Sequence, residues 1–178
     1  WNIARRIEWE NTIQLKELFS SESLDVLYGE FIDQRYIDYL SSNFDDIDGI
    51  HWRKFEALTC EFFHKNGYYV KIGEGRNDDG IDARVWPSKE NLEQPPTIII
   101  QCKRQKEKVG KTVVKALWAD TIYEKAESGL LVTTSKVSPG AKKTNTARAY
   151  NVNFAERDTL KAWVQTMRTP NKGMFLAE

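Results

Sequence analysis

The sequence contains few of the residues that build zinc sites or disulfide frameworks. Among its 178 residues there are two cysteines and two histidines. Neither cysteine lies in a CxxC pair or beside a histidine, which argues against a zinc site. Cys60 and Cys102 both fall in apolar segments, so we expect two buried, reduced thiols and no disulfide. We expect His51 and His64 on helix surfaces, where neither binds a metal.

Long apolar stretches are also missing. No run approaches the roughly 20 apolar residues that cross a bilayer, so we expect no membrane partner. Residues 1–6 lead into charged sequence and not into a signal-peptide core, which favours a cytoplasmic protein. The chain begins with Trp1 instead of Met, as a piece of a longer protein would. With 40% hydrophobic and 29% charged residues, its composition is that of a soluble globular domain.

Charge is unevenly divided along the chain, although the formal net charge is zero. Residues 1–50 hold 4 Lys and Arg against 11 Asp and Glu, a net charge of −7. Residues 51–178 hold 22 against 15, a net charge of +7. The neutral total therefore does not argue against a polyanionic partner for the second part. We predict an acidic helical extension over residues 1–48 and a separate domain over residues 49–178.

The extension shows apolar residues at near-helical spacing, with Ser21 or Ser23 as the helix cap. These residues are Leu24, Leu27, Phe31, Ile32, Tyr36, Tyr39 and Leu40. A packing arm on the second domain is the preferred interpretation. A dimerisation surface and the tail of an upstream domain stay open as alternatives.

Periodicity and turn residues predict an α/β protein for the rest of the chain. The apolar run Ile98-Ile99-Ile100 favours a central strand that is buried on both faces. Ser138 followed by Pro139 is typical of a helix start. The predicted helices cover residues 50–66, 111–126, 138–150 and 158–167. The predicted strands cover residues 68–72, 81–86, 97–103, 130–134 and 152–154, with a loop over 87–96.

Charged and polar side chains gather at the ends of two of these strands. Asp79-Gly80-Ile81-Asp82 leads into one strand, and Gln101-Cys102-Lys103 ends the next. Gln101 and Lys103 are two apart on a strand, so they share one face. Glu56 lies on the preceding helix. Taken singly, these residues are ordinary turn carboxylates and solvent-facing strand ends, so the interpretation depends on the whole set.

Together the residues resemble the Mrr-like restriction endonucleases, a branch of the PD-(D/E)xK nucleases. The resemblance covers roughly residues 51–165. It rests on Phe55-Glu56, Gly67-Tyr68, Asp79 to Asp82, Gln101 to Lys103, Leu131 to Ser135, and Ser138 to Ala141. It implies a restriction-endonuclease-like fold, with a central mixed β-sheet flanked by helices, here with an N-terminal helical extension. The implied activity is Mg²⁺-dependent hydrolysis of DNA, in the effector of a restriction or anti-phage defence protein.

By this resemblance Asp82 is the central metal ligand and Glu56 a second one, direct or through water. The Gln101 side chain and the Cys102 peptide carbonyl are further ligands, with Mg²⁺ as the ion and Mn²⁺ as its substitute. Lys103 aligns the attacking water and stabilises the transition state. Glu56, Asp82, Gln101 and Lys103 are thus the predicted catalytic residues.

Two positions depart from the wider superfamily. Gln101 stands where many relatives carry Asp or Glu, so it offers an oxygen without a charge. Ile81 precedes Asp82 where the wider superfamily has proline, a departure usual for the Mrr-like branch. Asp79 is either an auxiliary ligand or a turn residue, and the turn role is preferred.

Two basic runs flank these strand ends and suggest phosphate contacts. Residues 103–115 hold six basic residues and one acidic one, and residues 136–148 hold four basic residues and no acidic one. The predicted nucleic-acid contacts are Arg104, Lys106, Lys108, Lys111, Ser138, Lys142 and Lys143. No helix-turn-helix or zinc-finger reader is evident, so sequence recognition is expected from additional domains or subunits. The alternatives are a catalytically inactive nucleic-acid-binding domain and an assembly domain that forms a homodimer or larger oligomer.

Overall fold

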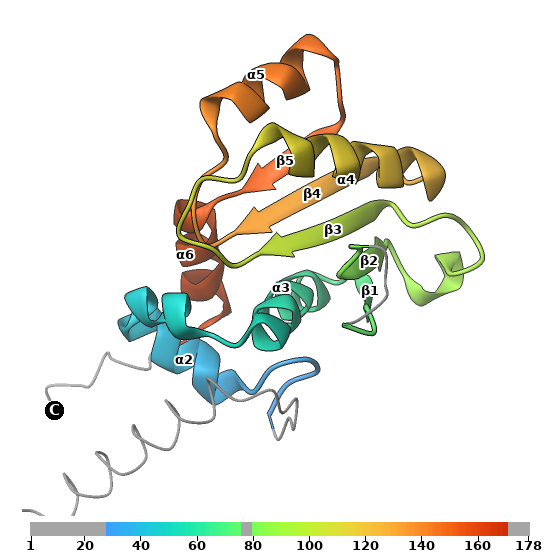
Figure 1. Ribbon diagram of the computed structural model, residues 1–178. Helices are drawn as coiled ribbons and strands as arrows, with labels where there is room; N and C mark the ends of the chain where they lie inside the picture. Colours follow the sequence, from blue (N-terminus) through green and yellow to red (C-terminus); the bar gives the residue numbers. More distant parts are fainter. Residues whose placement is uncertain (1–27, 76–79, 171–178) are drawn as a thin grey trace, which may run out of the picture.

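The computed structural model describes residues 28–75 and 80–170. Its centre is one mixed sheet in which the strand order follows the chain, β1-β2-β3-β4-β5 (Figure 1). β1 pairs antiparallel with β2, and β2 with β3, whereas β3, β4 and β5 run parallel. The strands are β1 Tyr69–Ile72, β2 Ala83–Trp86, β3 Ile98–Lys103, β4 Ser128–Thr133 and β5 Val152–Ala155. This confirms the predicted mixed sheet.

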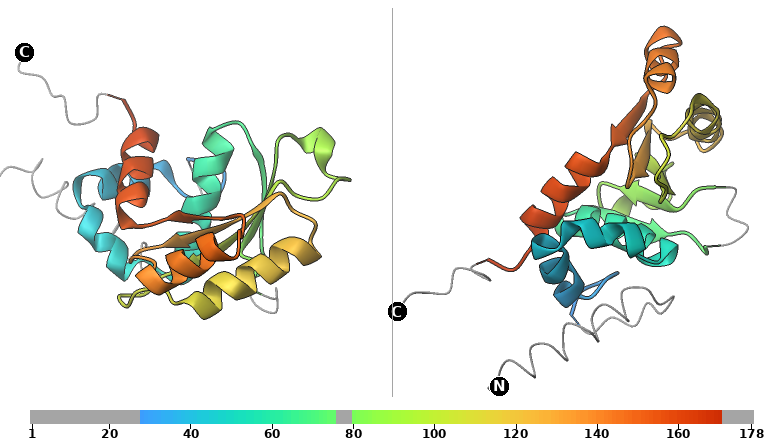
Figure 2. Two further views of the ribbon diagram at one scale, coloured as in Figure 1. Left: turned by 90° about the horizontal axis from the view of Figure 1, so that it is seen from above. Right: turned by 60° about the vertical axis from the view of Figure 1, so that its left-hand side comes forward.

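Helices cover both faces of the sheet (Figures 1 and 2). On one face α4 lies against β4, and α5 packs on α4; α3 and α6 lie on the other face, with α2 outside them. The α-helices are α2 Gln34–Ser42, α3 Trp52–Lys65, α4 Lys111–Tyr123, α5 Pro139–Ala147 and α6 Arg157–Met167. The 3₁₀ helices are η1 Phe44–Gly49 and η2 Lys89–Asn91, the second inside the predicted loop. No helix of the described residues has the length and apolarity that a bilayer crossing needs.

The two helical layers explain the apolar run in β3. Ile100 belongs to the cluster under α3 and α6, while Ile99 belongs to the cluster under α4. Both side chains are fully buried. Because side chains alternate along a strand, only a strand covered on both faces needs apolar residues at consecutive positions. β3 is therefore the central strand that the sequence predicts.

Helix α3 carries Glu56 and begins one turn before it. His51 precedes the helix, and its Nδ1 accepts a hydrogen bond from the backbone N–H of Arg53 at 3.2 Å. His51 is thus a helix cap. The chain leaves the helix through Gly67, whose φ of +88° suits glycine. Helix α5 begins as predicted, with the Ser138 hydroxyl accepting from the Ala141 N–H at 3.1 Å.

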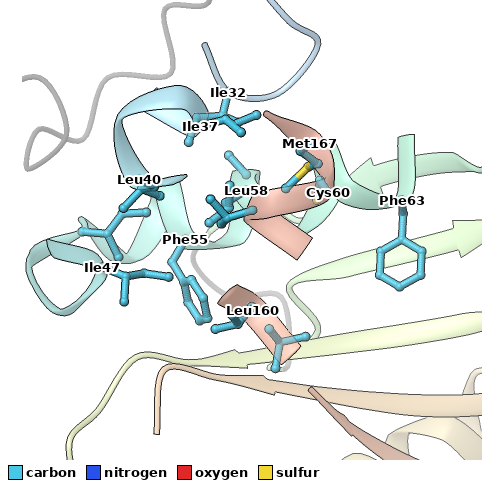
Figure 3. Close-up of a cluster of buried hydrophobic side chains, with 14 of the residues drawn as sticks. Ile32, Ile37, Leu40, Ile47, Phe55, Leu58, Cys60, Phe63, Leu160 and Met167 are labelled. Carbon is cyan, nitrogen blue, oxygen red and sulfur yellow. The ribbon is translucent and has the colours of Figure 1, made fainter. Parts of the chain in front are cut away.

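The described part of the extension packs onto α3 and α6 (Figure 3). Ile37, Leu40 and Ile47 are fully buried in the same cluster as Phe55 and Leu160. Fully burying such side chains contributes about 1.5–3 kcal/mol each. Residues 28–48 are therefore a packing layer on the second domain, whereas the domain boundary at residues 48 and 49 stays a prediction.

The helix in this layer begins later than the periodicity suggests. Within the described residues α2 starts at Gln34, and the Asp33 carboxylate accepts from the Arg35 N–H at 2.9 Å. An aspartate in this place satisfies a backbone donor that the first turn leaves unpaired. The predicted caps Ser21 and Ser23 lie outside the described residues, as do Leu24 and Leu27.

Candidate active site

Asp82 lies directly before β2 and contacts the end of β3. Its backbone N–H donates to the Ile100 carbonyl at 2.8 Å, and its Oδ2 accepts from the Cys102 N–H at 2.6 Å. The Asp82 carboxylate thus accepts the Cys102 N–H in place of a backbone carbonyl of the strand that neighbours β3. This bond fixes the Asp82 side chain at the strand end that carries Gln101 and Lys103.

Glu56 approaches Asp82 from helix α3. Only 6% of Glu56 is exposed to solvent. The pKa of Glu56 is raised to about 7, chiefly by burial, with further raising contributions from the charge of Asp82 and a hydrogen bond with that carboxyl; Arg53 opposes the rise. The structure therefore brings together two carboxylates, the buried Glu56 of helix α3 and the half-buried Asp82 that precedes β2.

Arg53 is the countercharge of Glu56. Its guanidinium Nη1 lies 2.8 Å from Glu56 Oε2, one helical turn away. The ion pair is largely buried, with 14% of the Arg53 side chain exposed. Sequence reasoning missed Arg53. The available signal was its position three residues before Glu56, where side chains on one helix meet.

Gln101 lies against the turn that precedes Asp82. A Cβ added at Gly80 would lie 3.3 Å from Nε2 of Gln101, and Gly80 has a φ of +81°. The glycine therefore allows both the left-handed turn and the close approach of the Gln101 amide. Asp79, for which a turn role was predicted, is outside the described residues.

Lys103 is the last residue of β3 and is partly buried. Within residues 28–75 and 80–170 its ammonium makes no hydrogen bond or ion pair. Lys103 and Gln101 stand two apart on the strand and so share one face, as predicted. β3 thus ends in a cation that no described residue neutralises.

The donor set fits a divalent cation held by oxygen. Glu56 and Asp82 supply carboxylates, and the Gln101 side chain and the Cys102 carbonyl add neutral oxygens of the kind that Mg²⁺ accepts. Two carboxylates in contact repel each other when both are ionised, and a bound cation relieves that repulsion. Among residues 28–75 and 80–170 no group of three or more Asp, Glu, His or Cys residues gathers in one place.

The predicted nucleic-acid contacts fall into two groups. Arg104, Lys106 and Lys108 lie exposed on the connection from β3 to α4, and Lys111 is the exposed first residue of α4. On α5, Lys143 is exposed, but the Lys142 ammonium is bound to Glu156 at 2.6 Å and Ser138 caps its own helix. The first group continues the edge of the sheet that holds Lys103. The contacts of both groups with nucleic acid stay predictions.

The chain is similar to a family model, to a curated protein and to a solved structure. The restriction endonuclease family model Mrr_cat matches residues 47–164. A curated protein of Sinorhizobium fredii (strain NBRC 101917 / NGR234), described as uncharacterized protein y4cE, is 24% identical over 132 residues. The alignment covers 74% of this chain and 34% of that protein, so the chain spans about a third of the length of the curated relative it matches. The solved structure of MspJI restriction endonuclease in complex with a 27-mer oligonucleotide has a TM-score of 0.49 at 20% identity, over 78% of this chain and 32% of that one.

Proposed function

Because the chain belongs to the restriction endonuclease family, we propose that it is a metal-dependent endonuclease that hydrolyses DNA phosphodiester bonds. The membership bears out the resemblance seen in the sequence. The observation that carries the proposal is the contact between Glu56 and Asp82 beside the strand that ends in Lys103. A fold has no structural need for a buried carboxylate in contact with a half-buried one, whereas phosphodiester hydrolysis uses such a pair.

In the proposed site Glu56 and Asp82 bind the cation, Mg²⁺ or in its place Mn²⁺. The Gln101 side chain and the Cys102 carbonyl complete the oxygen ligands. When bound, such a cation polarises the phosphate and lowers the pKa of its water. Asp82 is positioned by the Cys102 N–H, so its direction is set before any ligand arrives. Arg53 supplies the countercharge of Glu56 in the metal-free chain.

Lys103 acts on the phosphate itself. An ammonium at the end of β3, with no partner among the described residues, is available to a phosphate oxygen. It stabilises the negative charge that grows on the phosphorane and aligns the attacking water. Removing a comparable donor from other enzymes lowers kcat by about 100- to 1000-fold.

The larger biological role follows from the family and is also proposed. We infer that the chain is the effector domain of a restriction or anti-phage defence protein that acts on DNA in the cytoplasm. Target recognition then belongs to additional domains or subunits, and cleavage of both strands to a homodimer or larger oligomer.

A plasmid assay tests the proposal. Supercoiled DNA is incubated with the wild type, Asp82→Ala, Lys103→Ala and the matched control Glu61→Gln, in Mg²⁺, in Mn²⁺ or in EDTA. Glu61 is a buried glutamate of the same helix, but its carboxylate binds the backbone of residues 30 and 31, away from Asp82. We expect the wild type and Glu61→Gln to nick the DNA in Mg²⁺ and in Mn²⁺ but not in EDTA. The nicking rate of Asp82→Ala and Lys103→Ala should be lower by about 100-fold or more. Equal cleavage by all four proteins would refute the assignment, and DNA binding without any turnover would favour the inactive binding domain.

A further inference from the structure

A cavity of about 380 Å³ opens beyond the ends of β3 and β4. It lies where the parallel strands β3, β4 and β5 all end, at the start of α6 (Figure 1). Its lining combines basic and hydroxyl side chains with one carboxylate. The charged and serine side chains of the lining are Asp48, Lys106, Lys108, Ser135, Lys136 and Arg157.

The walls of the cavity are tied together by hydrogen bonds. The Ser135 hydroxyl donates to the Lys106 carbonyl at 2.9 Å, and the Val109 N–H donates to the Lys136 carbonyl at 2.8 Å. Thr134 bonds to both the N–H and the carbonyl of Gln105 at 3.2 Å through its hydroxyl. The two loops that carry the lysines are therefore held against each other. The cavity is a built feature of the fold.

The charge of the lining favours an anion. Lys106, Lys108 and Lys136 are exposed and make no ion pair with any described residue. Arg157 is held by Asp48 at 2.7 Å, and Asp48 is the only acidic residue in the lining. Four cations against one carboxylate, with a serine hydroxyl between them, make a site for a group with several acceptor oxygens and negative charge. A phosphate is such a group.

The position of the cavity points to which phosphate it takes. The N–H of Thr134, which lines the cavity, donates to the carbonyl of the proposed catalytic Lys103 at 3.3 Å, and the lining residue Gln105 is two residues beyond Lys103. Asp82 stands at the β2 end of the same sheet edge, two strand spacings or about 10 Å away. A distance of this size is spanned by a few nucleotides of one strand, because the strand winds around the duplex axis.

We propose that this cavity binds a backbone phosphate of the substrate strand, a few nucleotides from the phosphate that is cut, and that Asp48 competes with it for Arg157. The proposal rests on the proposed nuclease function and adds a second phosphate subsite to it. Arg157 holds Asp48 only while no phosphate is present. Neutralising Asp48 therefore removes the carboxylate that competes within the cavity and leaves Arg157 with Asp45 at 3.1 Å outside it, whereas neutralising Lys136 removes a contact.

The test measures binding of a fluorescein-labelled DNA duplex in Ca²⁺, over a range of salt concentrations. Lys136→Gln is compared with Lys161→Gln, an exposed lysine of α6 outside the lining. Asp48→Asn is compared with Asp45→Asn, because Asp45 also binds Arg157, at 3.1 Å, but does not line the cavity. We expect Lys136→Gln to weaken binding about fivefold and to lower the salt slope by about one. Asp48→Asn should tighten binding more than Asp45→Asn, whose carboxylate lies outside the cavity, and Lys161→Gln should bind like the wild type.

Two results would overturn the subsite. One is an equal loss in Lys136→Gln and Lys161→Gln, and the other is an equal gain in Asp48→Asn and Asp45→Asn. A third arm adds dAMP or inorganic phosphate in a thermal-shift assay. If Lys136→Gln abolishes stabilisation by these small anions but leaves DNA binding intact, the cavity takes a free phosphate compound and the strand proposal is wrong. Binding that follows the expected pattern without any Mg²⁺-dependent cleavage would instead refute the nuclease function and keep the subsite.

Discussion

Replacing Glu56 by glutamine should stabilise the metal-free protein at alkaline pH. The pKa of Glu56 is raised in the fold, first by burial and then by the charge of Asp82. The folded state therefore keeps a proton that the unfolded chain releases between about pH 4.5 and 7. Stability falls as pH rises through this window, and the whole penalty is present above it. Glutamine has no proton to lose, so Glu56→Gln escapes the penalty.

The size of the effect follows from the pKa. The difference between the ordinary value of 4.5 and about 7 corresponds to about 3 kcal/mol of unfolding free energy at pH 8. Some of this gain is lost, because the variant gives Arg53 a neutral partner in place of a carboxylate. We expect a net gain of about 2 kcal/mol at pH 8, or about 4–8 °C in Tm for a chain of this size. Near pH 4.5 the gain should disappear.

Urea unfolding in EDTA at pH 5 and pH 8 measures this difference. The control is again Glu61→Gln, since the Glu61 carboxylate accepts from the Phe31 N–H at 2.7 Å and from the Glu30 N–H at 3.2 Å. Its neutralisation weakens satisfied charge-assisted bonds, so this variant should lose about 1–3 kcal/mol at pH 8. The reasoning is refuted if Glu56→Gln is no more stable than the wild type at pH 8, or if its advantage is the same at both pH values.

Two further predictions concern the cation and the packing of the sheet. Mg²⁺ at about ten times its Kd should raise the Tm of the wild type by about 3–5 °C in a thermal-shift assay, and leave the Tm of Asp82→Asn unchanged; equal shifts would place the ion elsewhere. Gly129→Ala should lose about 1–3 kcal/mol in urea unfolding, because its Cβ would lie 2.7 Å from the Thr121 hydroxyl of α4. A Cβ at Gly140 meets no atom within 4 Å, so Gly140→Ala is the matched control and should lose nothing.

The sheet could be predicted because its signals are local. Burial on both faces of β3 requires consecutive apolar residues, and Ile98 to Ile100 supply them. The start of α5 is equally local, since Ser138 and Pro139 satisfy the first turn by themselves. The family order of the motifs then placed Glu56, Asp82 and Lys103 on three neighbouring elements.

The partners of the charged residues could not be predicted in this way. Arg157 binds Asp48 across 109 residues, and Glu61 binds backbone N–H groups 30 and 31 residues before it. Such pairs produce no regular spacing of residues in the sequence, because they depend on how helices and strands pack against one another. The cavity beside Lys136 was missed for the same reason: its walls come from the loops after β3 and β4, the start of α6 and residue 48. Arg53, on the same helix as Glu56, did have a local signal, because residues three apart on a helix meet.

The two carboxylates of the site differ in how firmly the fold holds them. Asp82 is bound by a backbone N–H of the central strand, so its oxygen Oδ2 cannot turn without breaking that bond. Glu56 is held by a side chain, Arg53, which lies on its own helix and can move. A cation entering between them would therefore find Asp82 already placed and would have to draw Glu56 away from Arg53. Loss of the Arg53 side chain should for that reason change the metal affinity more than the free energy of unfolding, whereas loss of the Asp82 side chain should change both.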